Sequence, residues 1–449
     1  MQVEGKSFTV VGAGRSGIAA SNVLASRGGD VRLVEARPEA DRPAGLDPRV
    51  AYEAGTNAPG PGDVAVLSPG VPEVSPVRAE IAALAAEVIG EVELFYRLSP
   101  APVLAITGTD GKSTTTTMLG AICAAANPST FVGGNLGNPL CEGLDALHAG
   151  SVVIAEISCF QLTTCVDFRP RVAIVTNIAE DHLNYHGSFE AYMAAKRRVW
   201  ARMTAEDTLI LNADDPFIAR WERPAAPRLR TFSLSDPAAD AHFDGTHLIV
   251  RHRGEAVPFM TRAELPLLGA HNVANALASA LAAEAWGVPL DLVRSALMQY
   301  TPLPHRLARV ATIDGVDWIN DSKATNANAA SAGIRAIDAP LVLLAGGSEK
   351  DADFTAFGAL VRERTKAAVL YGQTRHSLAR AIGPDHPTTV VETLAEAVAV
   401  ARGLAVPGDA VLLGPACASF DQFKSYGHRG DVFASLVREL AATGASAAQ

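Results

Sequence analysis

The sequence predicts an α/β protein of three domains, each Rossmann-like or doubly wound, with a phosphate-binding loop in the central domain. The chain has 449 residues, more than one hydrophobic core usually serves. Short apolar runs alternate with helical stretches, which is typical of parallel sheets with crossover helices. Proline-rich stretches at 100–102 and 301–304 interrupt this pattern. We therefore expect domains at 1–95, 96–301 and 302–449.

The first domain opens with a strand at 8–11 that runs into the glycine loop Gly12–Gly17. A helical stretch leads to a second strand, which ends in Glu35, and a further strand stops at Ser68-Pro-Gly70. The spacing of the glycines and of Glu35 matches a dinucleotide-binding fingerprint. Taken alone, this domain predicts an NAD-dependent oxidoreductase.

In the central and third domains the apolar strands have polar residues or glycines at their C-terminal ends. The ligand crevice of an open parallel sheet lies outside those ends, so these residues are expected to converge. In the central domain the strands are 103–106 before Thr107, 152–155 before Glu156, 172–175 before Thr176-Asn177 and 208–211 before Asn212. In the third domain they are 318–319 before Asn320-Asp-Ser-Lys323, 341–344 before Gly346-Gly347 and 411–413 before Gly414.

Composition excludes several classes of protein. Hydrophobic residues make up 48% and charged residues 19%, an ordinary globular balance. The net charge is −10 and no long basic patch is present, so no nucleic-acid partner is expected. The sequence shows no signal peptide and no apolar run of the roughly 20 residues that a membrane span needs. The five scattered cysteines fit reduced thiols. We expect a cytoplasmic protein with no membrane partner.

The loop from Thr107 to Thr114 is the strongest single motif. It follows a buried strand and precedes a helix, where backbone N–H groups and the helix N-terminus attract phosphate. Lys112 is expected to contact the outer phosphates and Ser113 to offer a hydroxyl to Mg²⁺. Ile106 stands where the general phosphate loop has its first glycine, so the loop is a shorter variant. The alternative is a glycine turn with chance neighbours.

Three further residues could complete this site. Glu156 could reach a metal held by Ser113, or it could be a solvated acid at a strand end. On a helix at 189–200, Lys196 falls within the apolar stripe formed by Phe189, Tyr192, Met193, Val199 and Trp200. A buried amine loses its charge and could take up CO₂ as a carbamate, whereas a snorkelling lysine would keep its ammonium in water. His182, beside Asn177 and Asp181, is favoured as a site residue over a structural histidine.

Together the motifs resemble the Mur ligase family over nearly the whole chain. They include G-x-G-x-S-G at Gly12, S-P-G at Ser68, G-E-V-E-L-F at Gly90, G-T-x-G-K-S-T at Gly108, E-I-S-x-F-Q-L at Glu156, E-D-H at Glu180, A-A-K at Ala194, H-N-x-x-N at His271, H-R at His305, N-D-S-K-A-T-N at Asn320 and P-A-C-A-S-F-D-Q-F at Pro415. The resemblance implies an ATP-dependent acid–D-amino-acid ligase of peptidoglycan precursor synthesis. Its expected substrates are UDP-N-acetylmuramoyl-L-alanine and D-glutamate, joined through an acyl phosphate by a monomer that uses ATP and Mg²⁺.

The resemblance also assigns roles to residues. ATP would be bound by Gly108, Thr109, Asp110, Gly111, Lys112, Ser113, Thr114, Asn272, Asn275, Arg306 and Asp321. Metal ions would be held by Ser113, Glu156, His182 and carbamylated Lys196, and the catalytic residues would be Lys112, His182 and Lys196. The UDP substrate would contact Arg15, Ser16, Arg37, Gly70 and Asn135. D-glutamate would contact Lys323, Thr325, Lys350, Ser419 and Tyr426. From this resemblance we also expect the third domain to close over the bound nucleotide.

Some positions depart from the family pattern, and some alternatives stay open. Asp110 stands where asparagine is common and adds a negative charge near the phosphates. The other departures are Ala36, Cys159, Asn184 and Tyr426. Another Mur-type ligase or a folylpolyglutamate synthetase remains the nearest alternative within this class. An NAD-dependent oxidoreductase and a non-enzymatic nucleotide switch are the alternatives outside it.

Overall fold

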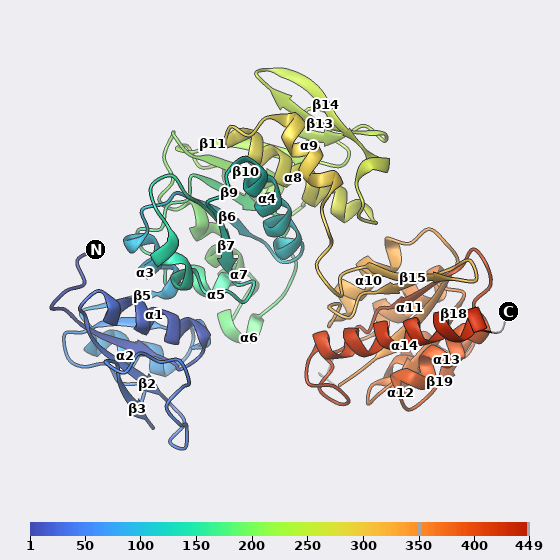
Figure 1. Ribbon diagram of the computed structural model, residues 1–449, viewed down its shortest axis with the longest axis horizontal. Helices are drawn as coiled ribbons and strands as arrows, with labels where there is room; N and C mark the ends of the chain where they lie inside the picture. The colour runs from blue at the N-terminus through green and yellow to red at the C-terminus, as the bar shows by residue number, and fades with distance from the viewer. Residues whose placement is uncertain (349–352, 447–449) are drawn as a thin grey trace. The chain divides into compact units, whose positions relative to one another are not determined.

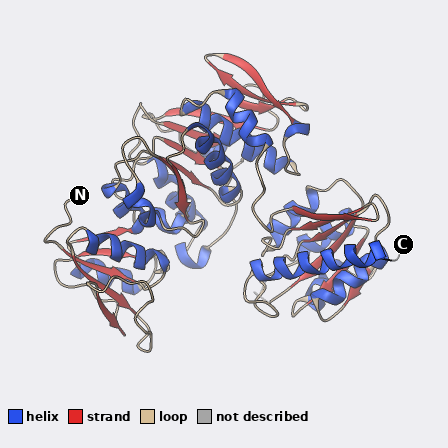
Figure 2. Ribbon diagram, viewed as in Figure 1, coloured by secondary structure: helices blue, strands red, loops and turns tan. Residues whose placement is uncertain are grey.

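The computed structural model describes residues 1–348 and 353–446 (Figure 1). These residues form three β-sheets flanked by helices (Figure 2). The chain divides into two compact units: the first comprises Met1–Leu265 and Val273–Tyr300, and the second comprises Pro266–Asn272 and Thr301–Gln449. The first unit holds two of the sheets. The expected α/β class is therefore confirmed, while the division at residues 95 and 301 stays a prediction.

The N-terminal sheet has five parallel strands in the order β3-β2-β1-β4-β5. The chain order reverses at β1, and loops after β1 and β4 therefore border one crevice. The strands are β1 (Ser7–Val11), β2 (Asp30–Glu35), β3 (Ala51–Ala54), β4 (Val64–Leu67) and β5 (Glu87–Gly90). The helices are α1 (Arg15–Ser26), α2 (Pro76–Leu84) and α3 (Glu91–Leu98).

The second sheet of this unit has nine strands in the order β14-β13-β12-β11-β10-β9-β6-β8-β7. Its strands are β6 (Val103–Thr107), β7 (Thr130–Gly134), β8 (Val152–Glu156), β9 (Val172–Val175), β10 (Thr208–Asn212), β11 (Arg228–Ser233), β12 (Ala241–Phe243), β13 (His247–His252) and β14 (Glu255–Thr261). The associated helices are α4 (Lys112–Ala126), α5 (Cys159–Leu162), α6 (Leu183–His186), α7 (Phe189–Arg197), α8 (Ala270–Ala285) and α9 (Leu290–Met298), with short 3₁₀ helices η1 (Leu140–Ala146), η2 (Arg198–Trp200), η3 (Ile218–Arg220) and η4 (Arg262–Glu264).

One continuous core joins the two sheets of the first unit. Helix α3 contributes Leu94 and Phe95, which are fully buried in the same cluster as Val153 of β8 and Val175 of β9. Burial of a side chain such as Phe95 contributes about 1.5–3 kcal/mol. Helix α3 packs against α1, α5 and η1, and α5 packs in turn against α7. This shared core explains why both sheets belong to one compact unit.

The second unit is built on a six-stranded sheet in the order β15-β16-β20-β17-β18-β19. Strands β15 (Ala308–Ile313) and β16 (Val316–Asn320) are antiparallel, joined at Asp314-Gly315, both with positive φ as a tight hairpin requires. The other strands, β17 (Leu341–Gly346), β18 (Ala367–Tyr371), β19 (Thr388–Val390) and β20 (Ala410–Leu413), pair in parallel. The helices are α10 (Ala327–Arg335), α11 (Thr355–Arg364), α12 (Arg375–Ile382), α13 (Leu394–Leu404) and α14 (Tyr426–Ser446).

Every strand expected from the sequence is present, with ends that agree to within one or two residues. The expectation was incomplete, because the sequence did not predict β3, β5, β7, β11, β15, β18 and β19, nor the extension of the central sheet by β12, β13 and β14. Strand β12 pairs in parallel with β11, whereas β13 and β14 continue the sheet in antiparallel pairs. Within the described part of the chain, no helix combines the length and the apolar character that a membrane crossing demands.

Candidate active site

Strand register brings the polar ends of the central sheet to one edge. Ile106 of β6 pairs with Glu156 of β8, and Thr107 pairs with Val175 of β9. Gly134 of β7 also pairs with Glu156, so Asn135 follows directly beside it. The chain after these strands therefore places the phosphate loop, Asn135, Glu156 and Asn177 at the same edge, as expected from the sequence.

The phosphate loop is fixed by hydrogen bonds to the segment that follows β9. The N–H of Thr109 donates to the Asn177 carbonyl at 2.9 Å, and the N–H of Asp110 donates to Asn177 Oδ1 at 2.8 Å. Thr176 Oγ1 donates to the Asp110 carbonyl at 2.6 Å. The Thr109 hydroxyl lies 2.7 Å from the hydroxyl of Tyr192 on α7. The loop is therefore held in one shape from two sides.

Two glycines of the loop cannot be replaced without displacing its neighbours. Gly108 has φ 141°, and a Cβ there would lie 1.9 Å from Thr176 Oγ1. Gly111, which caps α4, has φ 77°, and a Cβ there would lie 2.5 Å from Oδ1 of Asn275. Both the backbone conformation and the close contacts require glycine. This geometry favours a built phosphate cradle over a chance glycine turn.

Two lysines reach the carbonyl groups of this loop. Lys112 Nζ donates to the Gly108 carbonyl at 3.0 Å and to the Thr109 carbonyl at 2.6 Å. Lys196 Nζ donates to the same Gly108 carbonyl at 2.5 Å, and it lies 4.6 Å from the centre of the Tyr192 ring. One carbonyl oxygen thus accepts from both side chains, which places two positive groups beside the loop.

Lys196 is buried rather than snorkelling. Its exposed fraction is 1%, and the stripe residues Tyr192, Val199 and Trp200 are buried with it. Burial, together with the smaller effect of the nearby Lys112 cation, lowers the pKa of Lys196 to about 7. An amine with a pKa near 7 is largely uncharged slightly above neutral pH, which makes it nucleophilic. Of the two alternatives that the sequence left open, the structure selects the buried amine.

Glu156 supplies a carboxylate oxygen suited to a cation. The side chain is 2% exposed, and its Oε1 accepts from Asn135 Nδ2 at 2.7 Å. Its Oε2 is buried and has no hydrogen-bond partner among the described residues. A buried, unsatisfied carboxylate oxygen is costly unless a ligand satisfies it, and hard divalent cations prefer such oxygens. The residues present at this edge therefore fit a divalent cation, and they do not fit a solvated strand-end acid.

The remaining predicted metal residues lie around the same loop. Ser113 is the second residue of α4 and half-buried. His182 has a left-handed backbone, φ 53°, and its ring contacts Phe160 of α5 with centroids 4.6 Å apart. Partial burial lowers the pKa of His182, while Asp181 at 3.3 Å raises it. Among residues 1–348 and 353–446, no three His, Cys, Asp or Glu side chains form a ready metal cluster.

Asn272 and Asn275, the two amide side chains of α8, are both buried. Asn275 Oδ1 accepts from Thr115 Oγ1 of α4 at 3.2 Å, directly behind Gly111. Asn272 Nδ2 donates to the Leu268 carbonyl at 2.7 Å. Asn275 therefore supports the start of α4, and the adenine contact expected for the pair stays a prediction.

Four of the predicted UDP-substrate residues follow the carboxyl ends of strands in the N-terminal sheet. Arg15 and Ser16 begin α1, and Arg15 lies 3.6 Å from Glu142. Arg37 Nε donates to Glu35 at 2.9 Å, and the same carboxylate accepts from the Ala13 N–H at 3.1 Å. Arg37 therefore lowers the pKa of Glu35. Gly70 lies in the turn after β4, where its N–H donates to Ser68 Oγ at 3.5 Å.

Asn135, the remaining member of the predicted UDP-substrate set, directly follows β7 of the central sheet. Its side chain donates to Glu156, beside the phosphate loop, rather than to a residue of the N-terminal sheet. Its contact with substrate stays a prediction.

In the second unit, a strained turn carries Arg306. His305 has φ 62° and Leu307 has φ 44°, a conformation that non-glycine residues rarely adopt. The N–H of Leu307 donates to Asp321 Oδ1 at 3.2 Å. Burial raises the pKa of Asp321 to about 7, although the Leu307 N–H and the Arg306 cation oppose this. Strain held by such contacts is typical of functional turns.

The predicted D-glutamate residues follow the strands of the same unit. Lys323 Nζ lies 4.1 Å from the centre of the Tyr426 ring, a cation–π contact. Ser419 is buried in the segment after β20, and Thr325 is half-buried after β16. Lys350 lies outside the described residues. The structure therefore brings Lys323 and Tyr426 together.

Sequence analysis missed Arg429, which is fully buried beside these residues. Its Nε donates to Ser322 Oγ and its Nη2 to the Ser322 carbonyl, both at 2.9 Å. Its Nη1 lies within 3.1–3.4 Å of the carbonyl groups of Gly346, Cys417 and Ala418. One guanidinium thus joins the segments that follow β16, β17 and β20. In the sequence, Arg429 lies among residues of mixed polarity, and no local pattern distinguishes it from a surface arginine.

The fold and these sites define an α/β protein with a phosphate cradle in one unit and a second strand-end crevice in the other. Family models agree with this class: the Mur ligase middle domain matches residues 106–283, and the Mur ligase glutamate ligase domain matches residues 305–417.

Curated relatives extend the match to the whole chain. A UDP-N-acetylmuramoylalanine–D-glutamate ligase of Acidobacterium capsulatum is 41% identical, covering 100% of this chain and 99% of the relative. The enzyme of the same name from Pelotomaculum thermopropionicum is 40% identical, covering 97% and 98%. The chain belongs to the Mur ligase family.

Solved structures support the fold at lower identity. MurF from Acinetobacter baumannii is 20% identical with a TM-score of 0.62, covering 97% of this chain and 91% of that one. MurF from Thermotoga maritima, solved in complex with ADP, is 15% identical with a TM-score of 0.62, covering 98% and 97%. These structures share the architecture of the whole chain.

Proposed function

We propose that this chain joins D-glutamate to UDP-N-acetylmuramoyl-L-alanine with hydrolysis of ATP to ADP and phosphate, a step of peptidoglycan precursor synthesis. The observation that carries the ligase assignment is the pairing of a phosphate cradle with a buried, weakly basic lysine at the same loop carbonyl. A simple nucleotide switch has no use for that lysine. The substrate assignment is supported by the names of relatives about 40% identical over nearly the whole chain.

The chemistry that fits this site is activation of the acceptor carboxylate. The carboxylate attacks the γ-phosphorus of ATP to give an acyl phosphate and ADP, and the amine of D-glutamate then displaces phosphate from the carbonyl carbon. The protein's part is to bind, orient and shield the reactants. The loop N–H groups and Lys112 would orient the phosphates, and Asn135 holds the carboxylate of Glu156 in place.

Mg²⁺ is the metal that the family implies, and the donor set fits it. Ser113 and Glu156 would hold one ion, with Oε2 of Glu156 facing it, and His182 and Lys196 would hold a second. Bound Mg²⁺ would neutralise charge on the phosphate oxygens. Lys196 would help to hold a cation only in an anionic form. Its amine, with a pKa near 7, is suited to take up CO₂ and release a proton, which gives a negatively charged carbamate.

The other residue roles are proposed on the family resemblance. Thr109, Asp110, Thr114, Asn272, Asn275, Arg306 and Asp321 would complete the ATP site. The crevice of the N-terminal sheet would hold the UDP substrate through Arg15, Ser16, Arg37 and Gly70. D-glutamate would meet Lys323, Thr325, Lys350, Ser419 and Tyr426. We further propose three domains with boundaries near residues 95 and 301, and a cytoplasmic monomer; the five cysteines, all buried and free of disulfides, suit a reducing compartment.

Phosphate release tests this proposal. The protein is incubated with ATP, Mg²⁺ and UDP-N-acetylmuramoyl-L-alanine, and D-glutamate is compared with L-glutamate, L-alanine and meso-diaminopimelate. We expect release that depends on both the acceptor and D-glutamate. Release that needs no amino acid, or that another amino acid supports better, would overturn the assignment.

An NAD-dependent oxidoreductase is the alternative that the first glycine loop suggested. Its acidic residue would have to accept hydrogen bonds from a ribose, yet Glu35 already binds Arg37 and the Ala13 N–H. No observation in the described residues favours this alternative over the ligase.

A further inference from the structure

The segment Thr163–Phe168, here called the anchor segment, connects two edges of the candidate site. It follows α5, which begins three residues after Glu156, and it leads through 169–171 into β9, which ends before Thr176. None of its residues is among those proposed to bind a substrate. The way in which this segment is held nevertheless affects both strand ends.

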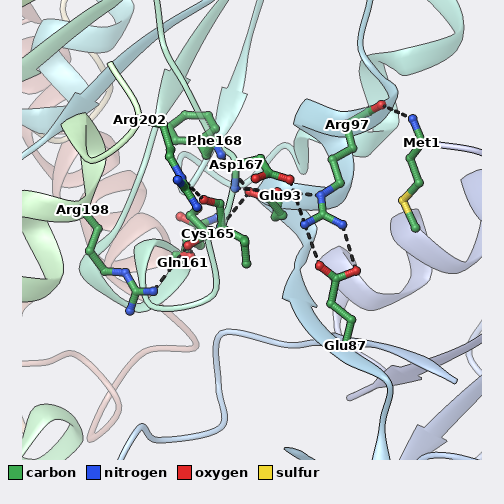
Figure 3. A network of polar contacts seen from close by, with 11 residues as sticks. Met1, Glu87, Glu93, Arg97, Gln161, Cys165, Asp167, Phe168, Arg198 and Arg202 are labelled. Carbon is green, nitrogen blue, oxygen red and sulfur yellow. Dashed lines mark hydrogen bonds and ion pairs between the residues drawn. The ribbon is translucent and has the colours of Figure 1, made fainter. Parts of the chain in front are cut away.

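One buried carboxylate holds the centre of the anchor segment. Glu93 of α3 has no exposed surface, and it accepts the N–H groups of three successive residues: Val166 at 2.9 Å, Asp167 at 2.9 Å and Phe168 at 3.0 Å. Arg97 Nε donates to the same carboxylate at 2.7 Å (Figure 3). Charge-assisted bonds of this kind are roughly twice as strong as neutral ones. An acceptor-only carboxylate is the side chain that matches four donors.

The N-terminal sheet contributes two further contacts. The N–H of Gly90 donates to the Thr164 carbonyl at 3.2 Å, and a Cβ at Gly90 would lie 2.1 Å from Thr164 Oγ1. Arg78 of α2 donates to both Oγ1 and the carbonyl of Thr163 at 3.0 Å. The anchor segment is therefore fixed to the sheet whose strand ends would hold the UDP substrate.

The opposite side of the anchor segment contacts the chain that follows Lys196. Arg202 Nε donates to the Val166 carbonyl at 2.8 Å, and Arg198 donates to the Cys165 carbonyl at 3.4 Å (Figure 3). Helix α5 packs between α3 and α7. Glu93 thus lies at the centre of contacts that join the N-terminal sheet, the chain that follows α5 and the chain that follows Lys196.

We propose that Glu93 is a positioning residue for the ligase reaction. By fixing three backbone N–H groups in the chain after α5, it sets the end of α5, and through this short helix Glu156. Through Arg198 it sets the start of η2, and with it Lys196, relative to the strand ends that would hold the acceptor substrate. This inference rests on the proposed function. In many enzymes, residues that do not touch the substrate hold the catalytic residues in their reactive geometry in this way.

The test compares Glu93→Gln with Glu87→Gln. Oε2 of Glu93 accepts from Val166 and Phe168, and Oε1 accepts from Asp167 and Arg97. A glutamine therefore presents an NH₂ group to two donors in either orientation. Glu87 is the matched control because it loses the same charge beside the same Arg97, yet it bonds no residue of the anchor segment in the described chain.

We expect Glu93→Gln to lower kcat about tenfold, as loss of a supporting contact typically does. The KM for D-glutamate should stay within about twofold, and Glu87→Gln should stay within about twofold in every constant. A purely structural role would lower the melting temperature without this split between kcat and KM. Wild-type kcat in Glu93→Gln, or an equal loss of kcat in Glu87→Gln, would overturn the proposal.

Hydrogen exchange separates this proposal from the function on which it rests. In Glu93→Gln the amides of 157–168 and 196–202 should exchange faster than in Glu87→Gln, whether or not the substrates are those proposed. If the wild-type protein made no product from D-glutamate, the proposed function would be refuted. The exchange rates of Glu93→Gln and Glu87→Gln could still be compared, because they do not depend on the substrate. Unchanged exchange in both stretches would refute the positioning role.

A second variant covers the case in which Glu93→Gln does not fold. Arg202 is exposed, so Arg202→Met should fold, and Arg220→Met on η3 is its matched control. We expect Arg202→Met to lower kcat about threefold, as remote coupling residues do, with faster exchange at 196–202. Equal kcat and equal exchange in the two arginine variants would contradict the proposal.

Discussion

Each unit of this protein buries one cation beside the loops at its strand ends, and the two cations are held in different ways. Lys196 makes a single hydrogen bond, to the Gly108 carbonyl, and its pKa is lowered to about 7. Arg429 donates to Ser322 and to three further backbone carbonyl groups, which saturates its guanidinium. A poorly solvated amine can give up its proton and react, whereas a saturated guanidinium keeps its charge and holds loops together. The comparison assigns a chemical role to Lys196 and a structural role to Arg429.

Replacement of Lys196 should give the largest effect on activity. Lys196→Arg keeps a cation but cannot become a neutral amine, so we expect phosphate release to fall by about 100-fold or more. Arg197→Gln is the control, because it removes a charge from the next position of the same helix, and it should retain most of the activity. Steady-state phosphate release measures both variants. If Lys196→Arg kept its activity, the reaction would not need a neutral amine at this position, and the chemical difference between Lys196 and Arg429 would not hold.

Replacement of Arg429 should act on stability. Arg429→Lys leaves three donors where the guanidinium offered five, so some of the five accepting oxygen atoms lose their partner and the free energy of unfolding should fall by about 3 kcal/mol. Arg438→Lys, exposed further along α14, should change stability by less than about 0.5 kcal/mol. Urea unfolding followed by far-UV circular dichroism gives both values. Equal stabilities of the two variants would show that Arg429 does not hold the loops.

Stability should depend on pH through Lys196. The pKa of Lys196 is lowered from 10.5 to about 7 in the folded chain, so between these values the unfolded chain binds the extra proton. Stability therefore rises with pH from about 7 to 10, and the cost of burying the lysine is largest below pH 7. Relative to Lys196→Met, the wild type should gain stability between pH 7 and 9 in CO₂-free buffer containing EDTA. If the stabilities of the wild type and Lys196→Met changed with pH in parallel, the amine of Lys196 would be solvated rather than buried.

The smallest effect is expected at Tyr426. Tyr426→Phe keeps the ring under Lys323 and should leave the KM for D-glutamate within about twofold. Tyr426→Leu removes the cation–π contact, worth about 0.5–1 kcal/mol at such a site, and should raise that KM about three- to fivefold. Kinetics at varied D-glutamate distinguish the two. Equal KM values for the phenylalanine and leucine variants would show that the ring of Tyr426 does not contribute to D-glutamate binding.

The sequence was sufficient for features that depend on local pattern. Apolar runs predicted many of the parallel strands, and periodicity placed Lys196 on the apolar stripe of its helix, where the structure buries it. Glycine spacing predicted the phosphate loop, because left-handed φ values and close contacts at Gly108 and Gly111 impose a residue type. The polar strand ends were expected to converge, and strand register brings Glu156 beside the loop.

The remaining features depend on contacts between distant segments, which leave no local signal. Glu93 and Arg97 resemble an ordinary helical charge pair in the sequence, yet Glu93 binds residues more than 70 positions away. Arg429 resembles a surface arginine, and Asn135 shows no sign of its bond to Glu156. The antiparallel strands β12 to β14 are short or mixed in polarity, so their pairing could not be separated from loops.

Transfer of oxygen-18 tests the central claim most directly. The acceptor is labelled in its alanyl carboxylate, and the protein is given ATP, Mg²⁺ and D-glutamate. If that carboxylate attacks the γ-phosphorus, one labelled oxygen leaves with the phosphate, and mass spectrometry of the released phosphate should show one label for each amide bond formed. Unlabelled phosphate, released with or without D-glutamate, would contradict the account.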